Sequence, residues 1–319
     1  MKTINKLILS LMLLIACAMS MGAAGVEYQR PDIPKNSTSI YIANDLGRNG
    51  YYEQKTIAEL MGWMAEDVDP EFVAAIGDVH HFEGVQSVSD PLWMTNYELI
   101  YSHPDLMLDW FPVMGNHEYR GNTQAVLDYK NVSRRWSMPG RYYSFETEVE
   151  DGNEKILFVF IDTTPLIDKY RKDGEDYPDA GKQSIAAQLE WLEKTLSEST
   201  AKWKIVFGHH PVFAYTSKSD TERKDMQARV KPLLDKYGVD AYVCGHIHNF
   251  QHIRPAGSKV EYLVNTAGSL SRSDVKPIDG TVFCNGEPGF TVLSVSDNLM
   301  RFFLYNYKGE IVHQFEIKK

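Results

Sequence analysis

The sequence predicts one layered α/β domain, because short apolar runs alternate with amphipathic segments through most of the chain before strands dominate. The composition agrees: of 319 residues, 43% are hydrophobic and 24% charged, which is enough to bury a large core. In addition, five of the short apolar runs are followed by Asp, Asn or His residues. Open α/β sheets place their ligand sites at such strand ends, so a functional site is expected there.

The first 24 residues are predicted to be a signal peptide. Lys2 and Lys6 precede the apolar run 7–16, which is shorter than a membrane-spanning helix. The segment 14–17, Leu-Ile-Ala-Cys, resembles a bacterial lipobox, in which Cys17 becomes the lipidated first residue. The alternative is ordinary cleavage near residues 23–24. Both interpretations predict export, to a periplasm or to a membrane through lipidated Cys17.

Residues 25–37 are expected to form a tether, because Pro31 and Pro34 interrupt a stretch with little periodicity. The predicted domain therefore spans 38–319. Within it, composition argues against two classes of protein. A net charge of −10 argues against nucleic acid as the main partner, although it permits a small phosphate ester at a metal site. Cys244 and Cys284 allow one disulfide but not a disulfide-built fold.

Each predicted element has a local reason. The run 156–161 is apolar almost throughout, as in a central strand, and Ser184 can cap a helix whose leucines recur at helical spacing. A charged loop is expected at 163–181. The predicted strands are 39–43, 72–76, 110–114, 142–145, 156–161, 204–207, 241–244, 260–264, 290–295 and 301–305. The predicted helices are 52–64, 91–101, the segment after Ser184, and 221–237.

Metal-ligand side chains follow five of these strands, most of them directly after a glycine. A single Gly-Asp is ordinarily a turn, and a single His is ordinarily a structural residue. Five such strand ends in one chain instead favour a shared site, and their carboxylate, imidazole and amide groups suit iron, manganese or zinc. No cysteine lies among them, which argues against a structural zinc site. These residues are Asp45, Asp78, Asn116, His117, His209, His246 and His248.

In the order Asp, Gly-Asp, Gly-Asn-His, Gly-His and Gly-His-x-His, the sequence resembles the calcineurin-like metallophosphoesterases. Within that superfamily it is similar to the small, tartrate-resistant, mammalian-type purple acid phosphatases, and the stretches 84–86, 161–163 and 244–251 carry this likeness. The resemblance runs from about residue 38 to at least residue 270. It implies a layered αββα sandwich of two mixed β-sheets flanked by helices, with the metal site at strand C-terminal ends.

The resemblance also implies roles for the candidate residues. Asp45 and His248 would hold the first metal ion, and Asp78 would bridge both ions. His117 would not be a ligand; it would face the phosphoryl group and stabilise its charge or protonate the leaving group. The second ion would be held by Asn116, His209 and His246.

The implied activity is that of an exported, metal-dependent acid phosphatase, which cleaves phosphomonoesters by attack of a metal-activated water. The alternatives are a phosphodiesterase or nucleotidase with the same site, because these motifs bind the phosphate and do not determine which group is esterified to it. A different class of protein, a surface lipoprotein that binds a phosphorylated ligand without turnover, is the third hypothesis.

Two departures from the family pattern stand out. In purple phosphatases a tyrosine three positions after the bridging Asp ligates the first metal, whereas this chain has His81. His81 could ligate through its imidazole or orient His117, with His80 as the substitute if the loop register differs. A neutral imidazole should weaken the preference for trivalent iron, so we expect iron paired with iron, zinc or manganese, without purple colour.

The second departure lies in the loop after His209. Mammalian-type enzymes carry a further histidine there, and the segment 215–225 contains none. His210 is expected to frame the site. Outside these motifs, His252 fits a core, rim or pocket position equally well, and His313 has no clustered partner in the sequence.

Overall fold

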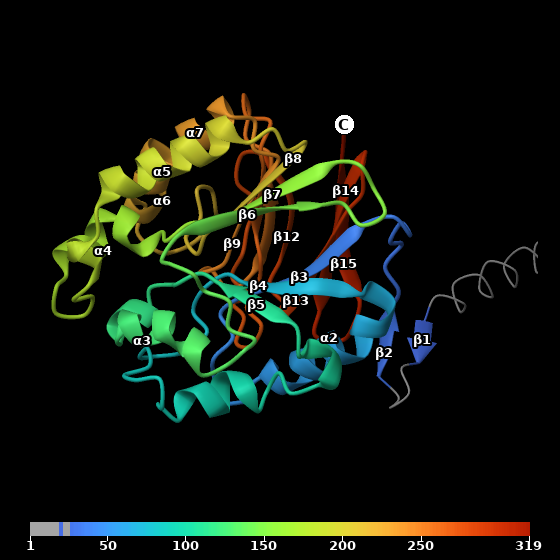
Figure 1. Cartoon of the computed structure of the whole chain (residues 1–319), viewed down its shortest axis with the longest axis horizontal. Coiled ribbons are helices and arrows are strands. Elements are labelled where there is room, and N and C mark those ends of the chain that lie inside the picture. Colours follow the sequence, from blue (N-terminus) through green and yellow to red (C-terminus); the bar gives the residue numbers. More distant parts are fainter. Residues whose placement is uncertain (1–18, 22–25) are drawn as a thin grey trace, which may run out of the picture.

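The computed structural model describes residues 19–21 and 26–319. The apolar leader run 7–16, Cys17 and the cleavage site near residues 23–24 lie outside the described residues. The predicted αββα sandwich is confirmed: two mixed β-sheets pack against each other, and helices flank them (Figure 1). Among the described residues, the longest apolar helices fall short of what a bilayer crossing requires.

One sheet has six strands in the order β15-β14-β13-β3-β4-β5. Its three strands β3, β4 and β5 run parallel, so their carboxyl ends meet at one edge, whereas the strands from the C-terminal part of the chain are antiparallel. The strands are β3 (Thr38–Ala43), β4 (Pro70–Ala75), β5 (Asp109–Pro112), β13 (Gly289–Val295), β14 (Leu299–Asn306) and β15 (Ile311–Lys318).

The other sheet has seven strands in the order β12-β10-β11-β9-β8-β7-β6. Its central strands β7, β8, β9 and β11 are parallel, and antiparallel strands close both edges. The strands are β6 (Tyr143–Glu148), β7 (Lys155–Phe160), β8 (Trp203–Phe207), β9 (Ala241–Cys244), β10 (Phe250–Ile253), β11 (Glu261–Val264) and β12 (Thr281–Asn285).

Aromatic side chains fill the space between the two sheets. Phe72 of β4 meets Phe158 of β7 edge-on at a centroid distance of 5.1 Å, and Phe111 of β5 lies 6.0 Å from Phe160. Such pairs add to the free energy of simple burial. These contacts fix how the parallel edges of the two sheets face each other.

The helices form for local reasons. In α2, Ile57, Leu60 and Met64 share the buried face, as their spacing predicted. The Ser184 hydroxyl accepts the Ala187 N–H at 3.2 Å and so caps α5. The α-helices are α2 (Gln54–Val68), α3 (Thr123–Asp128), α4 (Asp168–Lys172), α5 (Ile185–Glu198), α6 (Thr221–Arg229) and α7 (Lys231–Lys236). Short 3-10 or π-helical turns occur at Met94–Glu98, Pro104–Leu106, Glu118–Arg120, Tyr129–Asn131, Thr164–Leu166 and Ala180–Lys182.

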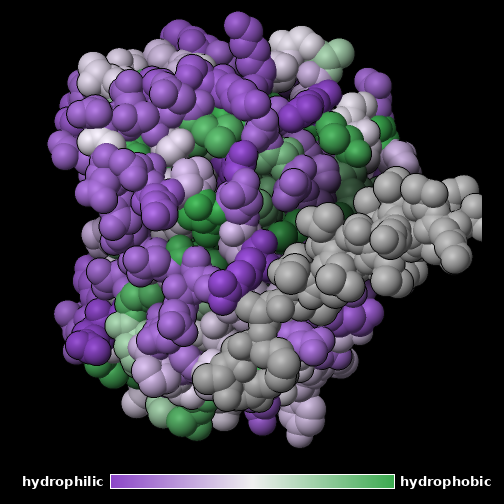
Figure 2. Space-filling model, turned by 90° about the vertical axis from the view of Figure 1, so that its right-hand side faces the viewer, coloured by the Kyte–Doolittle hydropathy of each residue, from purple (hydrophilic) through white to green (hydrophobic). Residues whose placement is uncertain are grey.

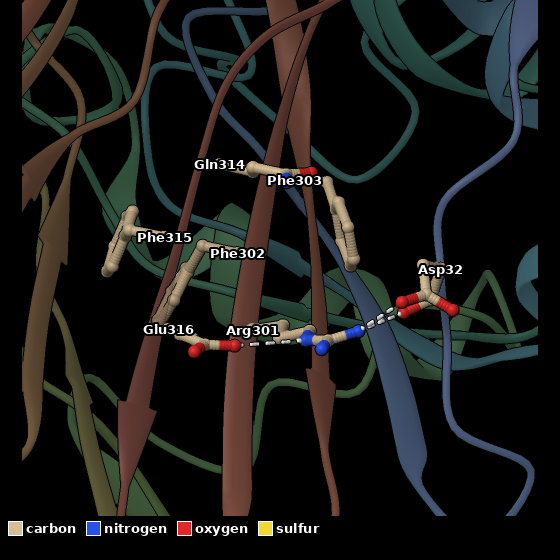
Figure 3. Close-up of a pocket in the computed structure, with 7 residues that line it drawn as sticks. All are labelled: Asp32, Arg301, Phe302, Phe303, Gln314, Phe315 and Glu316. Atoms are coloured by element: carbon tan, nitrogen blue, oxygen red, sulfur yellow. Dashed lines mark hydrogen bonds and ion pairs between the residues drawn. The ribbon is translucent and has the colours of Figure 1, made fainter.

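The segment expected to be a tether lies against the domain. Its strand β2 (Glu27–Gln29) pairs with β1 (Met19–Met21), and the Tyr28 hydroxyl donates to Asp67 at 2.5 Å. Further on, Asp32 pairs with Arg301 beside a small pocket of about 160 Å³ (Figure 3). The face of the molecule in Figure 2 is largely hydrophilic, with hydrophobic residues gathered around its centre. The pocket contains none of the predicted site residues; it is lined by Asp32, Arg301, Phe302, Phe303, Gln314, Phe315 and Glu316.

Candidate metal centre

The predicted site residues come together where the parallel edges of the two sheets meet. The loops after β3, β4 and β5 extend from the six-stranded sheet, and the loops after β8 and β9 extend from the seven-stranded sheet. Residues far apart in the sequence therefore become neighbours: the His246 N–H donates to the Asp45 carboxylate at 2.9 Å. Nearly all of these side chains are buried; only His117 is partly exposed.

Several buried polar atoms at this edge have no hydrogen-bond partner among the described residues. An unsatisfied buried polar atom costs roughly 1–3 kcal/mol, so a group of them at one place calls for a ligand. A cation is the ligand that fits, because each of these atoms offers a lone pair. The atoms are Asp45 Oδ1, His81 Nε2, Asn116 Oδ1 and His209 Nε2.

Four histidines at the site share one tautomer. The Nδ1 of each lies against a backbone carbonyl, which can only accept, so Nδ1 carries a proton and Nε2 is the nitrogen left to face a metal ion. This is the form in which imidazole binds a metal ion, and the carbonyl bond also fixes the ring orientation. The pairs are His81 with Gly47 (3.1 Å), His117 with Phe82 (2.5 Å), His209 with Ile76 (3.1 Å) and His248 with Leu270 (2.6 Å).

Asp45, His81 and His248 form one potential metal-binding group, with their donor atoms all within 4.8 Å of one another. Asp45 Oδ1 lies 3.0 Å from His248 Nε2 and 4.0 Å from His81 Nε2. His81 Nε2 also lies 3.4 Å from Asp78 Oδ2. This side of the site therefore offers two carboxylates and two imidazoles to a first metal ion.

A second group lies on the other side of Asp78. Asp78 Oδ2 lies 3.1 Å from His209 Nε2, and His209 forms a potential metal-binding group with His246 and His210. The His117 backbone N–H donates to Asp78 Oδ1 at 2.9 Å, which brings the adjacent Asn116 to the same carboxylate. Asp78 thus lies between the two groups, as a bridging ligand must.

Two other histidines beside the site are not assigned as ligands, although one of them, His210, belongs to the group of His209 and His246. Both ring nitrogens of His210 are engaged, Nδ1 with Thr163 Oγ1 at 2.8 Å and Nε2 with the Tyr170 hydroxyl at 3.2 Å. His80 packs edge-on against Trp93 at 4.7 Å and belongs to none of the potential metal-binding groups. His210 therefore frames the site, and His81 rather than His80 faces it.

The backbone is strained where the candidate ligands leave their strands. Asp45, Asp78, His246 and His248 have φ values of 50°, 54°, 71° and 62°, in the left-handed region that costs a non-glycine residue roughly 1–2 kcal/mol. The glycines of the motifs have a steric reason as well. A Cβ on Gly115 would lie 2.2 Å from Asp78 Oδ1, so only glycine allows that approach.

Without metal ions, opposite charges balance within the site. Burial raises the pKa of Asp78, but His209 and His117 outweigh burial and hold it well below its usual range. Burial likewise lowers the pKa of His209, but the Asp78 carboxylate outweighs it and raises this pKa to about 9. Burial lowers the pKa of His246 to about 3. Cations binding here would displace the proton of His209, since metal and proton compete for the same lone pair.

Two buried carboxylates support the ligands although no sequence pattern pointed to their roles. Glu118 accepts the backbone N–H groups of Gly115 at 2.7 Å and Asp78 at 2.9 Å, which ties two ligand loops together. Glu222 of α6 lies 3.1 Å from His246 Nε2 and accepts from the Tyr170 hydroxyl at 2.9 Å. With Nε2 directed at Glu222, the remaining nitrogen of His246, Nδ1, is the one left for a metal ion.

Lys218 also lies at the site, in the loop after β8. Its Nζ is 2.9 Å from His246 Nε2 and 3.2 Å from the His246 carbonyl oxygen. The family pattern implies a histidine in this loop, so no sequence motif singled out this lysine.

Comparison with known proteins agrees with this geometry. Residues 38–250 match the calcineurin-like phosphoesterase family. The chain is 32% identical to purple acid phosphatase 4 of Arabidopsis thaliana over 317 residues, which cover 96% of this chain and 91% of the relative. It is 31% identical to human tartrate-resistant acid phosphatase type 5 over 203 residues, 63% of this chain and 62% of the relative.

Solved structures show the same fold. GAP50, the anchor in the inner membrane complex of Plasmodium, superposes with a TM-score of 0.77 at 24% identity over 89% of both chains. A purple acid phosphatase from yellow lupin seeds superposes with a TM-score of 0.60 at 17% identity, over 92% of this chain and 56% of the lupin chain. The family resemblance predicted from the motifs is confirmed.

Proposed function

Because the chain belongs to the calcineurin-like phosphoesterase family and is a metal-dependent phosphatase, we propose that it hydrolyses small phosphomonoesters at the edge where its two sheets meet. The observation that carries this proposal is the convergence of buried, unpartnered donor atoms on both sides of Asp78. Such donors suit two cations that share one carboxylate.

The proposed ligands divide between two metal ions. Asp45, His81 and His248 would hold the first ion, and Asp78 would bridge to the second. Bound there, the ions would polarise the phosphoryl oxygens and lower the pKa of a water. The protein fixes the ligand side chains in two ways: the imidazoles bond to backbone carbonyls, and Glu118 bonds to the backbone N–H groups of Gly115 and Asp78. Burial of these side chains excludes bulk water from the site. The second ion would be held by Asn116, His209 and His246.

His117 is proposed to act on the substrate rather than on a metal. Its Nε2 lies 3.9 Å from Asp78 Oδ2, and its side chain is partly exposed. The Phe82 carbonyl accepts its Nδ1–H at 2.5 Å, which fixes the ring with Nε2 directed at the site. Carrying a proton on Nε2, His117 would stabilise phosphoryl charge or protonate the leaving oxygen, the role of a general acid.

His81 is proposed as a metal ligand rather than an orienting group for His117. The two rings are 4.3 Å apart, but the Nδ1 atoms bond to the Gly47 and Phe82 carbonyls instead of to each other's rings. A neutral imidazole here favours divalent over trivalent metal at the first site. We therefore propose iron with iron, zinc or manganese. His81→Tyr should gain visible absorbance on iron loading, and a colourless iron-loaded variant would place position 81 off the metal.

The test of the proposed reaction compares 4-nitrophenyl phosphate with bis(4-nitrophenyl) phosphate, using protein loaded with iron, manganese or zinc across a pH series. Monoester turnover that is absent in Asp78→Asn is expected. Preference for the diester would instead assign a phosphodiesterase or nucleotidase. Absence of turnover with metals bound would leave the phosphoryl-ligand-binding protein as the better account.

We also propose that the protein is exported and attached to a membrane through lipidated Cys17. The support is the leader sequence alone: Lys2 and Lys6, the apolar run 7–16 and the lipobox-like residues before Cys17. Cys17→Ala should move the protein from the membrane fraction to the soluble exported fraction. Mass spectrometry of the mature N-terminus checks this, and an unmodified N-terminus near residue 24 would establish ordinary cleavage.

A further inference from the structure

We propose that Arg48, Lys218 and Arg272 form an anion-binding rim beside the metal site, selecting phosphomonoesters whose leaving group carries a second anionic group. This inference rests on the proposed phosphatase function. The three residues come from three different loops, after β3, after β8 and after β11. The second group is a carboxylate or a further phosphate, which share the chemistry that a cationic rim recognises.

The rim residues lack the ion pairs that are common elsewhere in this acidic protein. No Asp or Glu of the described chain lies within 4.0 Å of the three basic groups. Beside Lys218, by contrast, Arg223 and Lys224 both pair with Asp220. At the far edge of the six-stranded sheet, Arg301 pairs with Asp32 and Glu316 (Figure 3). The rim cations therefore keep charge available for a ligand.

Arg48 borders the side of the site that holds His117. Its guanidinium lies over the Phe82 ring, 4.7 Å from the centroid, and the Phe82 carbonyl bonds to His117. The Arg48 Nε is buried without a hydrogen-bond partner among the described residues. A buried guanidinium nitrogen without a partner, close to His117, is a hydrogen-bond donor that an anionic ligand could satisfy.

Lys218 and Arg272 border the side that holds the Gly-His-x-His loop. Lys218 Nζ lies 2.9 Å from His246 Nε2, and the Arg272 backbone N–H donates to the His248 carbonyl at 2.7 Å. The Lys218 side chain is half-buried, whereas Arg272 is exposed. The rim thus extends from a position beside a candidate metal ligand, at Lys218, out to the solvent, at Arg272.

The rim adds three basic groups to a site whose buried carboxylates, Asp45 and Asp78, are assigned to the metal ions. Two metal ions already suffice for the scissile phosphoryl group, so the additional positive charge matches a second anion.

The test measures binding to the metal-loaded protein by titration calorimetry with non-hydrolysable ligands: phenylphosphonate, 3-carboxyphenylphosphonate and benzene-1,3-diphosphonate. We expect either second anion to tighten binding about tenfold or more relative to phenylphosphonate. The larger gain of the two identifies carboxylate or phosphate as the preferred group. Equal affinities for all three ligands would overturn the proposal, whether or not phenyl phosphate is hydrolysed in the separate activity assay.

Variants decide whether the rim causes the gain. The ratio to measure is the affinity for a ligand with a second anion divided by the affinity for phenylphosphonate. Arg272→Gln should reduce this ratio to below about threefold, and Arg48→Gln should reduce it independently. Lys259→Gln is the matched control, because exposed Lys259 precedes β11 at the end of the sheet opposite the ligand loops. It removes the same charge and should keep the full ratio. A ratio that is unchanged in both rim variants, or reduced equally in Lys259→Gln, would contradict the rim.

Discussion

The protein contains two histidine clusters whose local chemistry differs. At the strand ends, four imidazoles bond to backbone carbonyls through Nδ1 and direct Nε2 at the site, and His246 directs Nε2 at Glu222 and leaves Nδ1. In the core near β15, His252 donates or accepts through both nitrogens, to His313 at 3.0 Å and to Glu261 at 2.6 Å. His252 also stacks on Phe315 at 3.8 Å. The difference teaches that free, oriented lone pairs, and not histidine content, distinguish a metal centre from a structural cluster.

The largest effect is expected at the carboxylate that joins the two ligand groups. Asp78→Asn removes one negative oxygen of the bridge, so the variant should lose metal and lower kcat/KM by about 10³-fold or more. Metal analysis and hydrolysis of 4-nitrophenyl phosphate measure both. Asp176→Asn, which changes an exposed carboxylate, is the control. Near-normal turnover in Asp78→Asn would remove Asp78 from the bridging role.

His117→Ala should separate catalysis from metal binding. Because His117 is proposed to act on the phosphoryl group, the variant should keep its metals and lose about 10²- to 10⁴-fold in kcat. A leaving group of low pKa should restore part of the rate, since it needs no proton. His103→Ala controls for loss of an imidazole, because His103 accepts the Asp105 backbone N–H and belongs to none of the potential metal-binding groups of the described residues. Loss of metal together with activity would make His117 a ligand instead.

Glu222→Gln tests a positioning residue that the sequence did not reveal. The Glu222 carboxylate orients His246 and increases the donor strength of its imidazole, so the variant should bind the second metal roughly 10- to 100-fold more weakly. Competition with a chelator measures this, while thermal unfolding of the metal-free protein should change little. Glu190→Gln, on the exposed side of α5, is the control. Unchanged chelator competition would reduce Glu222 to a packing role.

The smallest effect is expected in the structural cluster. Burial, followed by the neighbouring His252, lowers the pKa of His313 from the usual 6.5 to about 4. A lowered pKa means that the neutral form is favoured on folding, so this contribution is present above pH 6.5 and is lost as pH falls towards 4. His313→Gln should flatten the pH dependence of unfolding free energy over that interval without affecting metal content. Denaturant titrations at several pH values check this, and altered metal binding would contradict the contrast between the clusters.

The sequence predicted the elements that precede the ligands because each is a short apolar run. Within the domain it missed β10, where buried Gln251 and His252 interrupt the apolar pattern, and the two edge strands β12 and β15, which have few buried side chains. The expected helix 221–237 is divided at Val230, which separates α6 from α7. The expected helix 91–101 is only a short helical turn at Met94–Glu98.

The candidate ligands were predictable because each directly follows its own strand. Their supporting groups were not, because contacts between distant segments create them. Glu222 reaches His246 from helix α6, and Lys218 reaches the same ring from a loop that carries no motif. In the sequence, neither residue can be distinguished from an ordinary exposed charged residue. Their roles become visible only in the structure, where α6 and the loop before it pack against the loop after β9.

The most direct test of the account is anomalous diffraction from crystals of the metal-loaded protein. The account predicts two anomalous peaks roughly 3.5–4 Å apart, one on each side of the Asp78 carboxylate. The first peak should lie beside Asp45, His81 and His248. A single peak, two peaks that do not share Asp78, or a peak at His252 and His313 would contradict the claim that free lone pairs at the strand ends form a two-metal centre.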